Sequence, residues 1–203
     1  MMISNKIKMA LVGLGHISKK HLQAIHTLKD KIELVAVCEN NKEILEQTNL
    51  PKEVKVYSNF SKMINNHVID VISLCTPSGL HPQQTIDAAK KNINVVTEKP
   101  MAISYSDAKK MIDACKNNNV KLFVVKQNRF NPAIQLLKQS IARKRFGNII
   151  LASLNVFWTR PQSYYDSADW RGTRKYDGGA LINQASHYVD LLQWLIGPVD
   201  SIQ

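Results

Sequence analysis

The sequence of 203 residues has little of what marks secreted, membrane-spanning or metal-dependent proteins. It has only three cysteines, no C-x-x-C pair and no histidines at metal-ligand spacing, which favours free, mostly buried thiols in a reducing compartment and predicts no metal site. No apolar run approaches the roughly 20 residues of a membrane span, and the apolar stretch near the start is too brief for a signal peptide. We therefore expect a cytoplasmic protein with no membrane partner.

Blocks of like charge are also lacking, although the net charge is +11. Scattered lysines favour a solvated surface over nucleic-acid binding, so no nucleic-acid partner is expected, and a basic protein attracts anionic substrates. The hydrophobic content of 44% is enough for a real core. At roughly 100–200 residues per domain, the length allows one full domain and part of another.

The most informative pattern is the apolar run that breaks into G-x-G-x-x-S and then into a helical pattern, at residues 9–25. It predicts a strand, a tight turn and a helix N-terminus that together bind a pyrophosphate. Gly13 permits the turn, Gly15 lets the backbone approach the phosphates, and Ser18 takes the third small position. The remaining residues of this predicted cofactor loop are Leu14, His16 and Ile17.

Glu39 ends a second predicted strand, residues 32–39, and lies 26 residues after Gly13. The acid that binds the ribose diol of a dinucleotide is expected roughly 20 residues after the turn. A carboxylate there accepts hydrogen bonds from the ribose hydroxyls and repels a 2′-phosphate, which favours NAD over NADP. The alternatives are that Glu39 is a solvated strand end, and that Lys42 weakens the repulsion.

Strand and helix patterns then alternate along the chain, which predicts right-handed crossovers and a parallel sheet. The fold class is α/β, a Rossmann-type doubly wound parallel sheet followed by a truncated α+β domain. The predicted domains are 1–126, which binds NAD, and 127–203, which is a partial substrate domain. Further strands are expected at 54–57, 68–75, 94–97 and 121–125, and helices at 41–49, 58–65 with Ser58 as cap, 82–91, and from a Ser104 or Ser106 cap to Cys115.

Three polar loops follow predicted strands and should meet at the cofactor crevice. With C-T-P-S at 75–78, E-K-P at 98–100 and G-G-A-L-I-N-Q-A-S-H at 178–187, the chain resembles the Gfo/Idh/MocA oxidoreductase family. The resemblance covers nearly the whole chain and implies a cis bond before Pro100. The cofactor-binding residues that it adds to those of the turn and Glu39 are Thr76, Pro77, Ser78, His81, Glu98, Lys99 and Gln127.

The resemblance implies that Lys99, Asn183 and His187 are catalytic. In the family this lysine lies beside the nicotinamide and the reacting hydroxyl, and the helix supplies the acid–base group. Histidine changes charge near working pH, and a lysine cation stabilises a developing alkoxide. Most members have Asp where Asn183 stands; an amide takes no proton, so the base role falls more heavily on His187. The alternatives are a packing histidine at 187 and a surface lysine at 99.

Within the family the chain is most similar to bacterial dehydrogenases that oxidise carbon 3 of UDP-N-acetylglucosaminuronic acid, whose product feeds an aminotransferase for surface polysaccharide. The motifs include K-Q-N-R-F-N at 126–131 and W-R-G-T at 170–173. Arginine forks suit a carboxylate or diphosphate, and Trp158, Tyr164, Tyr165 and Trp170 suit a sugar or uracil face. Alternatively, the arginines bridge loops and the aromatics fill the core. The predicted substrate-binding residues are Lys99, Arg129, Asn131, Arg160, Trp170, Arg171, Asn183 and His187.

Family members are longer and carry a large open sheet, through which they form homo-oligomers. Residues 147–158 are expected to be its first strand, and the helix with His187 should end at Gly197-Pro198. A lone strand exposes an apolar face and an unpaired edge, so reduced stability, aggregation or another pairing is expected. Other functions remain open: an inositol or free-sugar dehydrogenase, a non-catalytic NAD-binding remnant, or a subunit completed by another chain.

Overall fold

The computed structural model describes residues 6–202. The chain divides into two compact units, one ending at Val124 and the other beginning at Val125. Among the described residues, no helix is long and apolar enough to cross a membrane.

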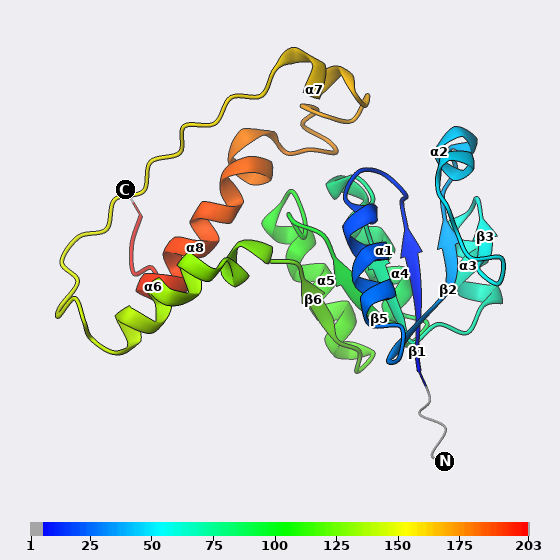
Figure 1. Ribbon diagram of the computed structural model, residues 1–203, viewed down its shortest axis with the longest axis horizontal. Coiled ribbons are helices and arrows are strands. Elements are labelled where there is room, and N and C mark those ends of the chain that lie inside the picture. Colours follow the sequence, from blue (N-terminus) through cyan, green and yellow to red (C-terminus); the bar gives the residue numbers. More distant parts are fainter. Residues whose placement is uncertain (1–5, 203) are drawn as a thin grey trace. The chain divides into compact units, whose positions relative to one another are not determined.

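The first unit is built on a parallel sheet of six strands in the order β3-β2-β1-β4-β5-β6 (Figure 1). The order runs outward from β1 on both sides, as in dinucleotide-binding folds, and confirms the predicted doubly wound sheet. The strands are β1 (Ile7–Val12), β2 (Ile32–Cys38), β3 (Lys55–Tyr57), β4 (Val71–Leu74), β5 (Asn94–Thr97) and β6 (Leu122–Val124).

Helices connect these strands and cover the sheet. They are α1 (Ser18–Thr27), α2 (Lys42–Gln47), α3 (Phe60–Asn66), α4 (His81–Ala89) and α5 (Tyr105–Asn117). A 3-10 turn, Ser78–Leu80, precedes α4. The amide of Lys62 donates to Asn59 Oδ1, so Asn59 caps α3 and the predicted Ser58 cap is wrong. Ser104 caps α5, as one of the two predicted alternatives has it.

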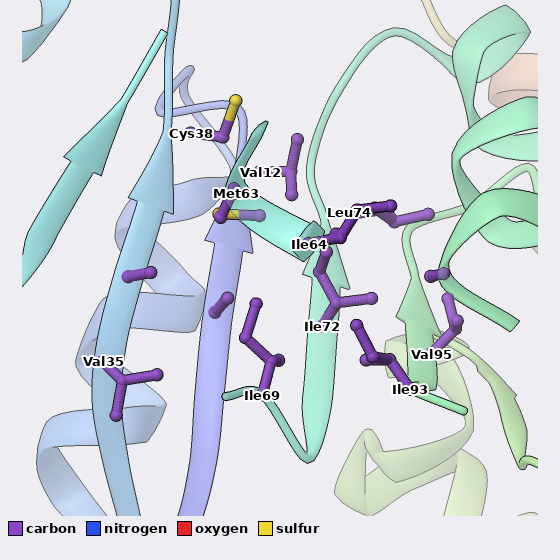
Figure 2. Packing of buried hydrophobic residues seen from close by; sticks show 13 residues of the cluster. Val12, Val35, Cys38, Met63, Ile64, Ile69, Ile72, Leu74, Ile93 and Val95 are labelled. Atoms are coloured by element: carbon purple, nitrogen blue, oxygen red, sulfur yellow. The ribbon is translucent and has the colours of Figure 1, made fainter. Parts of the chain in front are cut away.

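Two apolar clusters fill the faces of the sheet. Neighbouring residues of a strand point to opposite faces, so Ala10 and Val12 join one cluster and Leu11 joins the other. Figure 2 shows the first cluster, in which Met63 and Ile64 of α3 lie against β-branched residues of the strands. The second cluster packs against residues of α1 and α2. Strands buried on both faces explain the nearly continuous apolar runs in the sequence.

The second unit is mainly helical in the part of the chain that the structure describes. It contains α6 (Pro132–Ala142), α7 (Gln162–Asp166) and α8 (Ser186–Ile196), with a 3-10 turn at Gln127–Phe130 and a π-helical turn at Leu181–Ala185. Helix α8 ends at Ile196 and is followed by Gly197, where φ is +126°, as expected from the sequence. Helices α6 and α8 pack against each other.

The strand predicted at 147–158 is wrong. Residues 149–161 form no strand or helix, and Figure 1 shows them as a long coil. Ile150 is 96% exposed and Phe157 is 95% exposed. A strand needs a neighbour to bond with, and none of the described residues provides one, so the apolar character of the segment is not enough to define a ladder.

An ion pair ties α8 to the 3-10 turn of the second unit. Arg129 donates to both carboxylate oxygens of Asp190, from Nε at 2.8 Å and from Nη2 at 2.7 Å. Lys126 Nζ lies 3.4 Å from the same carboxylate. Burial would raise the pKa of Asp190, but the hydrogen bond from Arg129 and the two cations hold it below its usual value.

Replacement of Asp190 tests the contribution of this ion pair to stability. A lowered carboxyl pKa contributes stability above the unfolded pKa of about 3.9, and this stability is lost as pH falls through the folded value. Asp190→Asn is expected to lower the free energy of unfolding by about 2 kcal/mol at pH 7, and the difference from wild type should shrink below about pH 4. Urea titrations at several pH values measure it, with the exposed Asp200→Asn as the control. A difference that does not vary with pH would contradict the assignment.

Candidate active site

The Gly-rich turn lies where β1 ends, beside the end of β4. Gly13 has φ +82°, and a Cβ there would stand 2.9 Å from the carbonyl oxygen of Cys75. The Gly13 amide donates to the Cys38 carbonyl at 2.9 Å. Residue 13 must therefore be glycine for two reasons: its backbone φ is positive, and the loop after β4 approaches it closely.

The other side of the turn can receive a ligand. A Cβ at Gly15 would meet nothing within 4 Å. Helix α1 begins directly after the turn and has no acidic residue in its first turn, so its N-terminus favours an anion. Ser18 is buried and donates from Oγ to the Gly15 carbonyl at 2.6 Å, which fits the small position predicted where helix meets strand.

Glu39 is not a solvated strand end, because its residue is 9% exposed. Oε2 accepts the Leu14 amide at 2.8 Å, and Oε1 accepts the Asn40 and Asn41 amides, each at 2.9 Å. The carboxylate thus connects the end of β2 to the Gly-rich turn. A carboxylate has about four acceptor positions, so the three amides leave room for a ribose hydroxyl.

The loop after β4 is held by His81, which is 1% exposed. Its Nε2 lies 2.9 Å from the Thr76 carbonyl oxygen, and its Nδ1 lies 3.0 Å from the Pro100 carbonyl oxygen. Burial lowers the pKa of this imidazole. Both ring nitrogens face backbone carbonyls, and a neutral imidazole donates to one of them, so His81 connects the predicted cofactor loop at 76–78 with the segment after β5. Within that loop, Ser78 is also buried.

The E-K-P segment follows β5 and contains a cis peptide bond between Lys99 and Pro100, as the family resemblance implies. Glu98 is buried; its Oε2 accepts the Lys99 amide at 3.1 Å, and its Oε1 lies 2.9 Å from His21 Nε2. Burial would raise the pKa of Glu98, but hydrogen bonds from His21 and the Lys99 amide, with the charges of His21 and Lys99, hold it below its ordinary value.

Asn183 and His187 are both buried in the second unit. Asn183 lies in the π-helical turn that leads into α8, and its Nδ2 donates to Asp177 Oδ1. Asp177 is 5% exposed, and its Oδ2 accepts the Gly172 amide at 3.1 Å. The position where the family resemblance led us to expect Asp thus holds an amide here, with a buried carboxylate bonded to it.

Arginines and aromatic rings alternate in the second unit. The Arg160 guanidinium carbon lies 4.1 Å from the Trp158 ring centre and 4.6 Å from that of Tyr164. The Arg171 carbon lies 4.3 Å from the centre of Tyr164 and 4.9 Å from that of Trp170. The Nε atoms of both arginines are buried without a hydrogen-bond partner among the described residues. A donor in that state is costly unless a ligand satisfies it.

Other predicted substrate residues have structural partners. Arg129 bonds to Asp190, as the loop-bridging alternative expects. Asn131 caps α6 by accepting the Ala133 amide at 3.0 Å. Gln127, expected at the cofactor, begins the 3-10 turn of the second unit.

Two residues of these networks, His21 and Asp177, were not predicted from the sequence. A histidine in the first helix after a Gly-rich turn is a usable signal only when its partner, here Glu98, is known to lie beside it. Asp177 directly precedes the Gly-Gly motif, and this position alone does not indicate burial.

The three cysteines are free and buried, as predicted. Burial and the nearby Glu39 raise the pKa of Cys38 to about 11. Burial and the charge of Glu98 raise the pKa of Cys75 to about 12, although a hydrogen bond with Ser73 lowers it in part. Among the described residues, no group of His, Cys, Asp and Glu side chains could hold a metal ion.

Strand order, Gly-rich turn and the buried acid at the end of β2 define a dinucleotide-binding Rossmann domain. Comparison with known families agrees: residues 7–126 match the oxidoreductase family with an NAD-binding Rossmann fold, and residues 134–203 match the GFO/IDH/MocA C-terminal domain. The chain belongs to the Gfo/Idh/MocA family of oxidoreductases.

Two solved structures are especially similar. The WlbA dehydrogenase from Bordetella pertussis, in complex with NADH and UDP-GlcNAcA, is 51% identical, with a TM-score of 0.92 over 96% of this chain. WlbA from Chromobacterium violaceum, in complex with the same two ligands, is 46% identical, with a TM-score of 0.93 over 98% of this chain. This chain spans 58% of each of those chains. An uncharacterized oxidoreductase of Streptococcus pneumoniae is 31% identical over 70% of this chain and 38% of its own length.

The two glycines of the turn provide a matched pair of variants. Gly13→Ala should lower the free energy of unfolding by about 1–3 kcal/mol, because it combines a positive φ with contact to the Cys75 carbonyl. Gly15→Ala should leave stability within about 0.5 kcal/mol but reduce the rise in melting temperature that NAD causes. Thermal unfolding with and without NAD measures both. A Gly15→Ala protein that binds NAD as wild type does would contradict the assigned phosphate site.

Proposed function

We propose that this chain carries the cofactor and catalytic residues of an NAD-dependent dehydrogenase that oxidises carbon 3 of a UDP-linked N-acetylamino-sugar uronate. The main support is the 51% identity to an enzyme crystallised with NADH and UDP-GlcNAcA. The arginine and aromatic cluster of the second unit suits such a ligand, which is anionic and contains rings. The 3-keto product would serve an aminotransferase in surface-polysaccharide synthesis.

The first unit fits NAD. In this proposal the turn around Gly15 and the start of α1 hold the pyrophosphate, and Glu39 accepts a ribose hydroxyl and disfavours a 2′-phosphate. The loops at residues 76–78 and 98–99 border the nicotinamide end of the cofactor. When bound, NAD supplies the hydride acceptor for the alcohol carbon.

Lys99 and His187 divide the rest of the chemistry. The Lys99 ammonium binds the reacting hydroxyl oxygen and stabilises the negative charge that grows there. An imidazole nitrogen of His187 takes the proton of the hydroxyl as the hydride leaves the carbon that bears this hydroxyl. Asn183 cannot accept a proton. Because an ionised carboxylate only accepts hydrogen bonds, Asp177 fixes the Asn183 amide with its nitrogen toward the carboxylate, so Asn183 orients substrate by hydrogen bonding.

Arg160 and Arg171 are the proposed anion-binding groups. The aromatic rings fix the planes of both guanidiniums, and each Nε still lacks an acceptor among the described residues. A carboxylate or diphosphate oxygen would supply it with a charge-assisted bond. This is the observation that favours a charged nucleotide sugar over inositol or a free sugar.

The activity is tested by following NADH absorbance with NAD and UDP-N-acetylglucosaminuronate. Wild type is expected to form NADH only when the sugar is present, myo-inositol should not replace it, and His187→Ala should lower kcat by about 10²–10⁴-fold through loss of the base. If NAD raises the melting temperature but no NADH forms, the chain binds cofactor without turnover and the proposal fails for this chain.

The anion site is tested by calorimetric titration of Arg171→Ala with UDP-N-acetylglucosaminuronate and with UDP-N-acetylglucosamine, which lacks the carboxylate. Loss of a charge-assisted bond should weaken binding of the uronate by about tenfold or more. Loss for the uronate alone assigns Arg171 to the carboxylate, and equal loss for both assigns it to the diphosphate. The exposed Arg174→Ala is the control. Unchanged binding of both ligands by Arg171→Ala would contradict the site.

A further inference from the structure

A chain of partly buried hydrogen bonds runs from Ser73 in β4 to the backbone of Lys99. Ser73 of β4 is 0% exposed, and its Oγ lies 2.9 Å from Nδ1 of His21 on α1. His21 Nε2 lies 2.9 Å from Glu98 Oε1, and Glu98 Oε2 accepts the Lys99 amide at 3.1 Å. All four residues belong to the first unit.

The chemistry of the partners fixes the direction of the bonds to Glu98. Glu98 is ionised, so it only accepts, and His21 Nε2 must carry the hydrogen that it shares with the carboxylate. Nδ1 accepts from the Ser73 hydroxyl when the imidazole is neutral and donates to the Ser73 oxygen when it is charged, so this contact is satisfied in either state. Every member of the chain has a suitable partner, and a fully satisfied polar network is rigid.

The same segment is held from its other end. The Pro100 carbonyl faces Nδ1 of the buried His81, and the Lys99 amide faces Glu98. Side chains therefore contact the backbone before and after Lys99: Glu98 at the Lys99 amide, and His81, the first residue of α4, at the carbonyl of Pro100. The buried carboxylate of Glu98 is costly to keep in a protein interior, so a purely structural contact there would favour an apolar residue.

We infer that His21 and Glu98 are positioning residues, which fix the backbone of Lys99 so that its side chain keeps one place beside the substrate hydroxyl. The inference rests on the proposed function for what Lys99 does, but the hydrogen-bond chain itself does not. Because His21 stands on α1, whose first turn is the proposed pyrophosphate site, it also joins cofactor site and catalytic lysine through one helix.

The test compares His21→Ala with His21→Gln, whose amide can still donate to Glu98, and with His26→Ala, an exposed histidine of the same helix. Two readouts do not need turnover: hydrogen exchange at the Lys99 amide by NMR, and acetylation of the Lys99 amine relative to the exposed Lys91 by peptide mass spectrometry. In His21→Ala we expect the amide to exchange about tenfold faster or more and the acetylation ratio to change at least about threefold. His21→Gln should restore most of both, and His26→Ala should change neither.

Turnover, if wild type shows it, adds a third readout. Misplacement of Lys99 should lower kcat by about ten- to a hundredfold and leave KM for NAD within about twofold. Wild-type exchange and acetylation at Lys99 in a folded His21→Ala protein would overturn the inference, as would an altered backbone with unchanged kcat. If wild type forms no NADH, the proposed function fails, while exchange and acetylation still decide whether His21 positions Lys99.

Discussion

The approach of Gly13 to the Cys75 carbonyl is the contact on which the cofactor edge of the sheet depends. A side chain at residue 13 would stand 2.9 Å from that oxygen, so β1 and β4 can end side by side only with glycine there. The amide of Cys75 also donates to Val12, which continues the pairing to the last residue before the turn. Once these two strand ends are adjacent, the loops that follow β2, β4 and β5 can bond to one another.

Those bonds are made by three buried ionisable side chains and by His21, which is partly buried. Glu39 connects the end of β2 with the Gly-rich turn, and His81 connects the loops after β4 and β5. Glu98 and His21 connect the E-K-P segment with α1. Each group has hydrogen-bond partners, which offset part of the free-energy cost of removing it from water. The loops are therefore ordered by the first unit itself, before any ligand contributes binding energy.

Periodicity was sufficient for the sheet but not for the second unit. Strands such as β4 are buried on both faces and have a nearly continuous apolar sequence. Gly13 and Glu39 could be found by the spacing that the dinucleotide-binding motif predicts. His21 could not, since its role depends on Glu98, which is 77 residues away in sequence. Residues 147–158 were predicted as a strand from composition, yet pairing is a property of two segments. Arg129 was predicted to bind substrate, and the sequence did not show that Asp190 lies within reach of it.

The raised thiol pKa values have a practical side. Cys38 ends β2 and Cys75 follows β4, so two sulfurs lie at the edge of the sheet where the turn meets its neighbours. With pKa values of about 11 and 12, both remain protonated and shielded in the closed fold. A thiol-reactive dye can therefore modify these two thiols only when this edge opens. Their rate of modification, measured separately from that of Cys115 in α5, reports how often the edge opens, and no label has to be engineered into the chain.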